Sequence, residues 1–254
     1  MAYAIPVAPW TQQIELRWQP DLHFYERRTE ILRSLEAEGL LTGFQWQDKR
    51  IGARLGQFEV VYVTDSALSA SINGPRTSSQ GVRAAISMAL DALEPINVTL
   101  HGMTFQYLLP ISGDGTLAQE QTARRLAPEI LPEATPRDWA ILLDGRSTRL
   151  QSDFQVEFGV LRAEEMAGRL HGRLATFMPE LQEPSPVDLS DLPDGGMYYR
   201  WEWQMASLLD EDRRMEELIE LWVAAAEQSE QHSEALQRGR GLADIGKQET
   251  NESR

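Results

Sequence analysis

Large apolar and polar residues alternate strictly over residues 197–205, the most regular pattern in the chain. One side of this stretch carries two methionines, one tyrosine and two tryptophans. The other side carries Tyr198, Arg200, Glu202 and Gln204. Successive side chains of a β-strand point to opposite faces, whereas a helix would scatter the five apolar groups around its circumference. The pattern therefore predicts a half-buried strand with one aromatic face.

Other alternating or short apolar stretches predict further strands at residues 14–18, 44–46, 58–63, 67–72, 98–111, 139–143 and 153–161. Gly102 lies where the alternation of its strand changes phase, so we expect a β-bulge there. Asp144 and Gly145 are typical turn residues, and they predict a turn directly after the 139–143 strand.

Apolar residues at helical spacing predict helices at residues 22–38, 79–93, 163–177 and 211–237, and residues 117–128 predict a polar connecting helix. The last helix is divided. Its first half has an apolar stripe, which we expect to pack on the sheet with Trp222 against the aromatic strand. The second half, residues 227–237, is almost entirely polar, and we expect it to project beyond the domain or to pair with another chain.

The order strand, strand, helix, strand occurs twice, within residues 58–109 and again within residues 139–205. This repeat predicts an α+β protein of two pseudo-repeated lobes, with a mainly antiparallel sheet, helices on one face and a long C-terminal helix. The predicted divisions are an N-terminal lobe (1–112), a connecting segment (113–138), a C-terminal lobe ending in the long helix (139–237) and a flexible tail (238–254).

Charge and composition narrow the function classes. The 254 residues include 39 Asp and Glu against 24 Lys and Arg, a formal net charge of −15. Phosphate binding needs a basic surface, so nucleic acid is not the expected partner, and a nucleic-acid mimic or binder is only a second alternative. The chain has no cysteine, which excludes disulfides, thiolate zinc sites and cysteine nucleophiles. Without a signal peptide or an apolar run of membrane length, we expect a cytoplasmic protein with no membrane partner.

Candidate chemistry is sparse. The common motifs for nucleotide binding, zinc proteolysis and serine hydrolysis do not occur, and no two histidines stand three or four residues apart. We therefore assign no catalytic residue, no metal ligand and no cofactor. His101, beside the expected bulge at Gly102, is the centre of an alternative hypothesis: a hydrolase or metal-dependent enzyme whose carboxylates meet it only in the fold. Arg200 and Glu202 predict a same-face ion pair on the sheet surface.

The leading hypothesis is a non-enzymatic cytosolic binding or assembly protein. It would act through protein–protein contacts of the C-terminal helix and the sheet surface, with a homodimer as one form that this could take. The residues assigned to partner binding are Trp222, Glu227, Gln231, His232 and Arg238.

The overall layout resembles a sporadically distributed bacterial family of uncharacterised proteins of about 250 residues. The features that carry the resemblance are the opening strand at residues 14–18, the segment Asn73-Gly74-Pro75 between a strand and a helix, and the aromatic strand late in the chain. The resemblance implies neither a reaction nor a ligand, so no site residue is taken from it.

Overall fold

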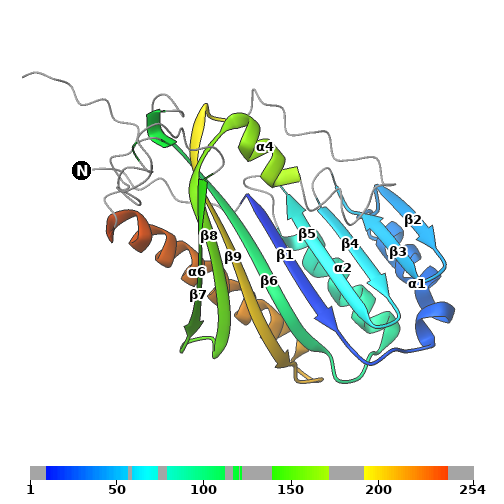
Figure 1. Ribbon diagram of the computed structural model, residues 1–254. Coiled ribbons are helices and arrows are strands. Elements are labelled where there is room, and N and C mark those ends of the chain that lie inside the picture. Colours follow the sequence, from blue (N-terminus) through cyan, green and yellow to red (C-terminus); the bar gives the residue numbers. More distant parts are fainter. Residues whose placement is uncertain are drawn as a thin grey trace, which may run out of the picture.

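The fold is organised around one nine-stranded antiparallel sheet with the strand order β2-β3-β4-β5-β1-β6-β9-β8-β7 (Figure 1). The computed structural model describes residues 10–56, 59–73, 79–111, 117–119, 121, 139–171 and 192–239. The strands are β1 (Thr11–Arg17), β2 (Gly43–Gln47), β3 (Arg50–Arg54), β4 (Glu59–Thr64), β5 (Ala67–Asn73), β6 (Thr99–Pro110), β7 (Trp139–Ser147), β8 (Ser152–Arg162) and β9 (Gly195–Leu208). The helices are α1 (His23–Ala37), α2 (Gln80–Leu93), α4 (Ala163–His171) and α6 (Arg214–Gly239). The predicted α+β class is confirmed.

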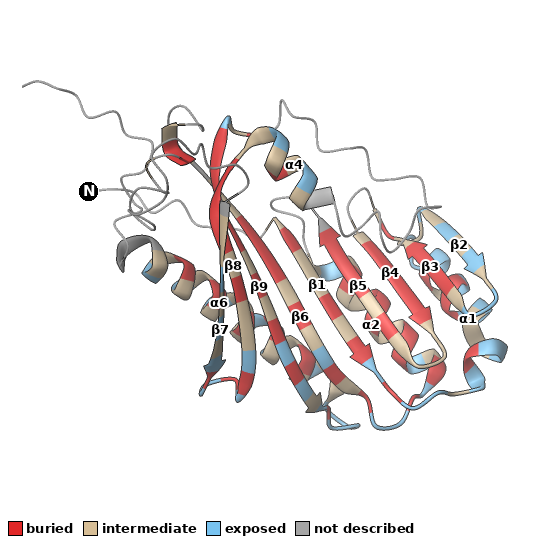
Figure 2. Cartoon of the chain, in the orientation of Figure 1, coloured by how far each residue is buried: buried red, intermediate tan, exposed pale blue. Residues whose placement is uncertain are grey.

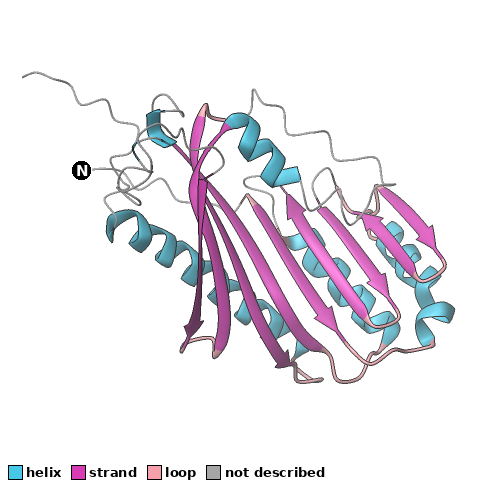
Figure 3. Ribbon diagram, in the orientation of Figure 1, coloured by secondary structure: helices cyan, strands magenta, loops and turns pink. Residues whose placement is uncertain are grey.

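Three helices, α1, α2 and α6, cover one face of the sheet, whereas α4 lies on the opposite face (Figure 3). The side chains of β9 explain the division. Tyr199, Trp201 and Trp203 face α6, and Tyr198, which points to the other face, packs with Met166 of α4. The prediction of helices on one face therefore holds for α1, α2 and α6, and α4 is the exception. The face opposite these three helices carries α4 and the small apolar cluster of Val60 and Tyr62, is otherwise mainly polar, and is called the open face below.

The two predicted lobes share one sheet, and their strands meet where β6 pairs antiparallel with β9. β1 is inserted between β5 and β6 and pairs with both. The second lobe has no equivalent insertion, because β9, β8 and β7 are direct neighbours. The sheet therefore carries the two repeats in mirrored order, β4-β5-β6 and β9-β8-β7, with β1 inserted into the first one only.

The aromatic strand is the centre of the core, as its alternation predicts. Much of β9 is buried (Figure 2). Tyr199, Trp201 and Trp203 are among its buried residues, and the two tryptophan rings stack with centroids 6.1 Å apart. Phe154 of β8 lies 5.4 Å from the ring of Trp201 and 5.1 Å from that of Trp203. Large aromatic side chains dominate core energetics because each removes a large apolar area from water.

The second half of α6 does not project into solvent, so that expectation is wrong. Ser229 and Ser233 of this half are buried, and each accepts a hydrogen bond from a tryptophan of β9. The Trp203 indole N–H donates to Ser229 Oγ and the Trp201 indole N–H donates to Ser233 Oγ, both at 2.9 Å. The polar half packs on the sheet because its serines satisfy the indole donors that a wholly apolar helix would leave buried and unpaired.

Two local predictions also need correction. β3 was not predicted, although Ile51 and Ala53 alternate with Arg50, Gly52 and Arg54 and are buried in the core. Asp144 and Gly145 do not form a turn: they lie within β7, and the turn follows at residues 148–151. Gly145 suits the strand because the Phe154 ring crosses it so closely that a Cβ would lie 2.3 Å from Phe154 Cζ.

Other predictions fall largely outside the described residues. These are most of the connecting segment 113–138, of which only residues 117–119 and 121 are described and helical, the end of the 163–177 helix beyond residue 171, and the tail beyond residue 239. In the part of the chain that is described, no helix combines the length and the apolar character needed to cross a membrane.

Candidate functional site

Trp222, the first residue assigned to partner binding, is buried in the core of the protein. Its side chain is only 3% exposed, its indole N–H donates to Gln12 Oε1 of β1 at 2.8 Å, and the Arg83 guanidinium of α2 lies 5.4 Å from its ring centroid. Trp222 thus anchors α6 across β1 and α2. It belongs to the same hydrophobic core as the aromatic strand, and because it is almost completely buried it presents no surface to a partner.

The other assigned residues of α6 differ in how they are used. Glu227 is half-exposed and pairs with Arg149 at 2.9 Å, while Gln231 is exposed. His232 lies against the sheet, with its ring 5.5 Å from that of Trp201, and its partial burial lowers its pKa. Arg238 belongs to α6 by its backbone, and its side chain lies outside the described residues. Gln231 and the exposed side of Glu227 are therefore the two assigned positions that reach the surface.

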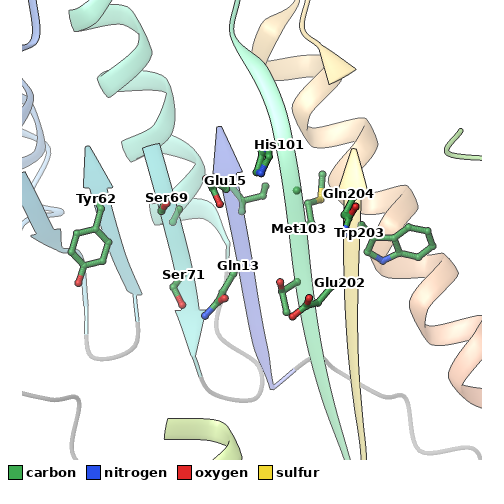
Figure 4. Close-up of a pocket in the computed structure, with 14 residues that line it drawn as sticks. Gln13, Glu15, Tyr62, Ser69, Ser71, His101, Met103, Glu202, Trp203 and Gln204 are labelled. Atoms are coloured by element: carbon green, nitrogen blue, oxygen red, sulfur yellow. The ribbon is translucent and has the colours of Figure 1, made fainter. Parts of the chain in front are cut away.

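His101, the centre of the enzyme hypothesis, is the extra residue of the bulge predicted at Gly102. In the pairing of β6 with both β1 and β9 the register steps from Leu100 to Gly102, so His101 is left out of both. Its side chain is exposed on the open face near Glu15 (Figure 4). The bulge thus places His101 on the same face of the sheet as Glu15, and both line the pocket described below.

The backbone around the bulge is tightly constrained. A Cβ on Gly102 would lie 2.7 Å from the Trp203 carbonyl oxygen, so only glycine fits there without a shift of β9. On the other side of the bulge, Ala206 has a φ of +50°, a left-handed conformation that is unfavourable for any residue with a Cβ. Such strained positions are found where the surrounding structure enforces them, and they are concentrated at functional sites.

A shallow pocket of about 240 Å³ lies on the open face beside the bulge. Its polar lining consists of Gln13, Glu15, Tyr62, Ser69, Ser71, His101, Thr104, Glu202 and Gln204 (Figure 4). Burial raises the pKa of the Tyr62 hydroxyl, so that group stays neutral and can serve as a hydrogen-bond donor. The volume is below the range of about 300–1,000 Å³ usual for small-molecule sites, so the pocket suits at most a small polar ligand.

The carboxylates of this region are engaged in ion pairs. Arg200 pairs with Glu202, as predicted, but not on an open sheet surface, and it also pairs with Glu157 of β8 at 3.4 Å. Arg169 of α4 pairs with the same Glu157, so the network continues onto the helix that covers this part of the open face. All four side chains are largely buried, and their mutual pairing offsets the cost of removing charge from water. Within the described residues, no three His, Asp or Glu side chains form a group suited to a metal ion.

The most unusual surface lies at the β2 end of the sheet. Phe44 and Trp46 are 60% and 43% exposed, although both point to the face that the helices cover. Their partners in β3, Ala53 and Ile51, are buried, so the helical cover ends between β3 and β2. Two large aromatic side chains on one face of a short terminal strand are a considerable exposed apolar area for a monomeric surface.

Arg28 of α1 joins these aromatics to the helix. Its guanidinium carbon lies 4.3 Å from the Trp46 ring centroid and 5.7 Å from that of the half-exposed Tyr25. It also donates hydrogen bonds to the carbonyls of Gln47 and Asp48, at 3.2 and 2.8 Å. We call Tyr25, Arg28, Phe44 and Trp46 the β2 patch. Arg28 contacts the rings of Tyr25 and Trp46 and so restrains these two side chains, which lowers the entropy cost of using them as a contact surface.

The sequence predicted the strand at residues 44–46 but not its role as a surface. The missed signal is the composition of β2, Gly-Phe-Gln-Trp-Gln, which contains no charged residue in a chain that is 25% charged. Natural proteins protect terminal strands with charges, proline or bulges. β7, at the other end of the sheet, fits that rule because its exposed Leu142 is followed by exposed Asp144 and Arg146.

Comparison with models of known protein families and with curated proteins finds no match for this chain. The resemblance to the sporadically distributed bacterial family stays a prediction.

Proposed function

We propose that this chain is a cytosolic, non-enzymatic binding or assembly protein that acts through protein–protein contacts. The single observation that supports this most strongly is the β2 patch, which combines exposed aromatic rings, a fixed arginine and an uncharged terminal strand. Aromatic residues and arginine are the types most enriched among the residues that dominate binding energy. Exposed Gln231 and Glu227 on α6 form a second, polar surface on the same side of the sheet.

The position of the patch also supports a contact role. Phe44 and Trp46 lie on the terminal strand of a nine-stranded sheet. Because β2 is hydrogen-bonded into this sheet, a partner would meet a rigid edge. Burial of apolar area stabilises an interface by about 25 cal/mol per Å², and rings that are already ordered lose little freedom on binding.

Site-specific photo-crosslinking tests the proposal. Phe44 is replaced by benzoylphenylalanine in the full chain, which is expressed in its native cells and irradiated. We expect a protein adduct at position 44 and none at position 142, where Leu142 is similarly exposed (57%) on the opposite terminal strand. Equal labelling at both positions, or none at position 44, would refute a contact role for the β2 patch.

A second candidate function is supported by the bulge at Gly102. His101, Glu15 and Glu202 line one pocket, and the residue with positive φ, Ala206, lies close to it in the sheet, which supports the enzyme hypothesis. A histidine near a carboxylate can act as a general base on a small polar substrate. Screening small esters and phosphoesters with the wild-type chain and with His101→Ala tests this. Any turnover that His101→Ala leaves unchanged would eliminate the pocket as its site.

A further inference from the structure

We propose that the β2 patch binds a second copy of this chain across a twofold axis. This inference depends on the proposed contact function and names its partner. Phe44 and Trp46 stand two residues apart on one face of β2, with Gln45 between them. If two copies meet with their β2 strands antiparallel and the axis at Gln45, Phe44 of each copy lies beside Trp46 of the other.

Such an arrangement suits the geometry of aromatic contacts. Directly opposed side chains of antiparallel strands have Cβ atoms about 4.5–5.5 Å apart, and aromatic pairs at that spacing are among the most stabilising cross-strand pairs. The axis would also set the two α1 helices on the same side of the joined sheets, since a twofold axis perpendicular to a sheet preserves its faces. Tyr25 and Arg28 of each copy would then frame the aromatic pairs.

The distribution of charge favours a second copy at this surface. Residues 22–54, which include α1, β2 and β3, contain six Lys and Arg against five Asp and Glu, a net charge of +1. The rest of the chain therefore carries −16. Two copies repel each other through most of their surface, and this nearly neutral region is where they can approach with the least repulsion. A strongly basic partner would instead be drawn to the acidic remainder.

The two ends of the sheet make this contact closed and specific. A contact between β2 of one copy and β7 of the next would be heterologous and would continue into an open fibre, whereas a β2–β2 contact uses the same surface twice and stops at a dimer. β7 is protected against such joining by exposed Asp144 and Arg146. The uncharged strand and the charged strand therefore have different roles.

The dimer should be weak. The β2 patch has four residues, whereas a standard stable interface uses about 20–30 residues on each side. We expect association only at high protein concentration, with a dissociation constant of about micromolar or above. Higher salt should strengthen it, because salt screens the repulsion between the acidic surfaces.

Sedimentation velocity of the purified full chain, over a wide concentration range and at two salt concentrations, tests the inference. We expect the mass to rise from one to two copies for the wild type, and Phe44→Lys to weaken dimerisation by at least about tenfold. Leu142→Lys, the same change on the other terminal strand, should have no effect. Far-UV circular dichroism verifies that both variants are folded, which their exposed positions favour.

The outcomes separate the two proposals. A wild-type monomer at every concentration, or a dimer that Phe44→Lys leaves intact while Leu142→Lys dissolves it, overturns the twofold contact at β2. If the purified chain is monomeric but benzoylphenylalanine at position 44 labels a different protein in cells, the second copy is refuted and the contact function stands. If position 44 labels nothing in cells and the purified chain is monomeric at every concentration, both proposals fail.

Discussion

Replacing Ser229 with alanine tests how α6 is held on the sheet. Trp203 is buried, and its indole N–H donates to Ser229 Oγ at 2.9 Å. The same hydroxyl donates to the Ala225 carbonyl at 2.8 Å, so Ser229 satisfies the indole donor while bonding to its own helix. Ser229→Ala removes the acceptor and leaves a buried N–H without a partner.

The expected loss follows from two opposing effects. A buried donor without an acceptor costs about 1–3 kcal/mol. Alanine has the better helix propensity, which returns no more than about 0.5 kcal/mol. We therefore expect Ser229→Ala to lower the free energy of unfolding by about 1–2 kcal/mol. In Trp203→Phe the donor is absent, so Ser229→Ala should cost much less there, giving a coupling energy of about 1 kcal/mol.

Urea unfolding followed by far-UV circular dichroism measures these differences, since Trp203→Phe changes the fluorescence signal. Gln231→Ala, on the exposed side of the same helix, is the control and should stay within about 0.5 kcal/mol of the wild type. A Ser229→Ala variant as stable as Gln231→Ala, with an unchanged m-value, would refute the docking of this half of α6.

Three further predictions concern strain, pH and charge. Ala206→Gly should raise the unfolding free energy by about 0.5–1 kcal/mol, because glycine adopts positive φ without a clash; urea unfolding would contradict this if the variant is less stable. Burial lowers the pKa of His232 from its ordinary value near 6.5, so the unfolded chain binds the proton more readily. The stability that the neutral His232 contributes is complete above pH 6.5 and is lost as the pH falls toward the folded pKa. Between pH 8 and pH 5 the melting temperature should therefore fall less for His232→Gln than for the wild type, and an equal fall in both would contradict the prediction. Glu157→Gln removes the carboxylate shared by Arg169 and Arg200 and should cost about 1–3 kcal/mol in urea unfolding, and a loss below about 0.5 kcal/mol would show the network to be dispensable.

Local patterns predicted the elements that bury a regular face. The aromatic strand was predictable because its five apolar groups alternate over nine residues, and a period of two has one structural solution. β3 was missed because Arg50–Arg54 is only five residues long and has a glycine at its centre. Its strand character comes from its place between β2 and β4, a tertiary effect that exceeds local propensity.

The two serines of α6 show why the polar half of that helix was misread. Ser229 and Ser233 are polar by type, and helical spacing alone does not say that they face a sheet. Their hydroxyl oxygens accept hydrogen bonds from tryptophans far away in the sequence: Trp203 lies 26 positions before Ser229, and Trp201 lies 32 positions before Ser233. A hydrogen bond between distant segments makes a polar residue compatible with the core, and local periodicity does not register it.

In the candidate sites, too, local features were predictable from the sequence, whereas features that depend on distant segments were not. The bulge beside His101 was predictable from the change of phase at Gly102, but the neighbours of His101 were not, because Glu15 and Glu202 come from strands that meet only in the sheet. The exposure of Phe44 and Trp46 depends on where the helical cover ends. That boundary is set by the packing of α1 and cannot be read from the five residues of β2.

The position of β1 constrains how this chain folds. β1 precedes both of its neighbours in the chain: β5 ends at Asn73, and β6 pairs with β1 as far as Gln106. A nascent chain must therefore keep β1 unpaired on one side until β6 has also been synthesised. Pairings of such long sequence separation form slowly. Until β6 pairs with β1, one edge of β1 has no partner strand. This interval is when the chain is most exposed to misassembly.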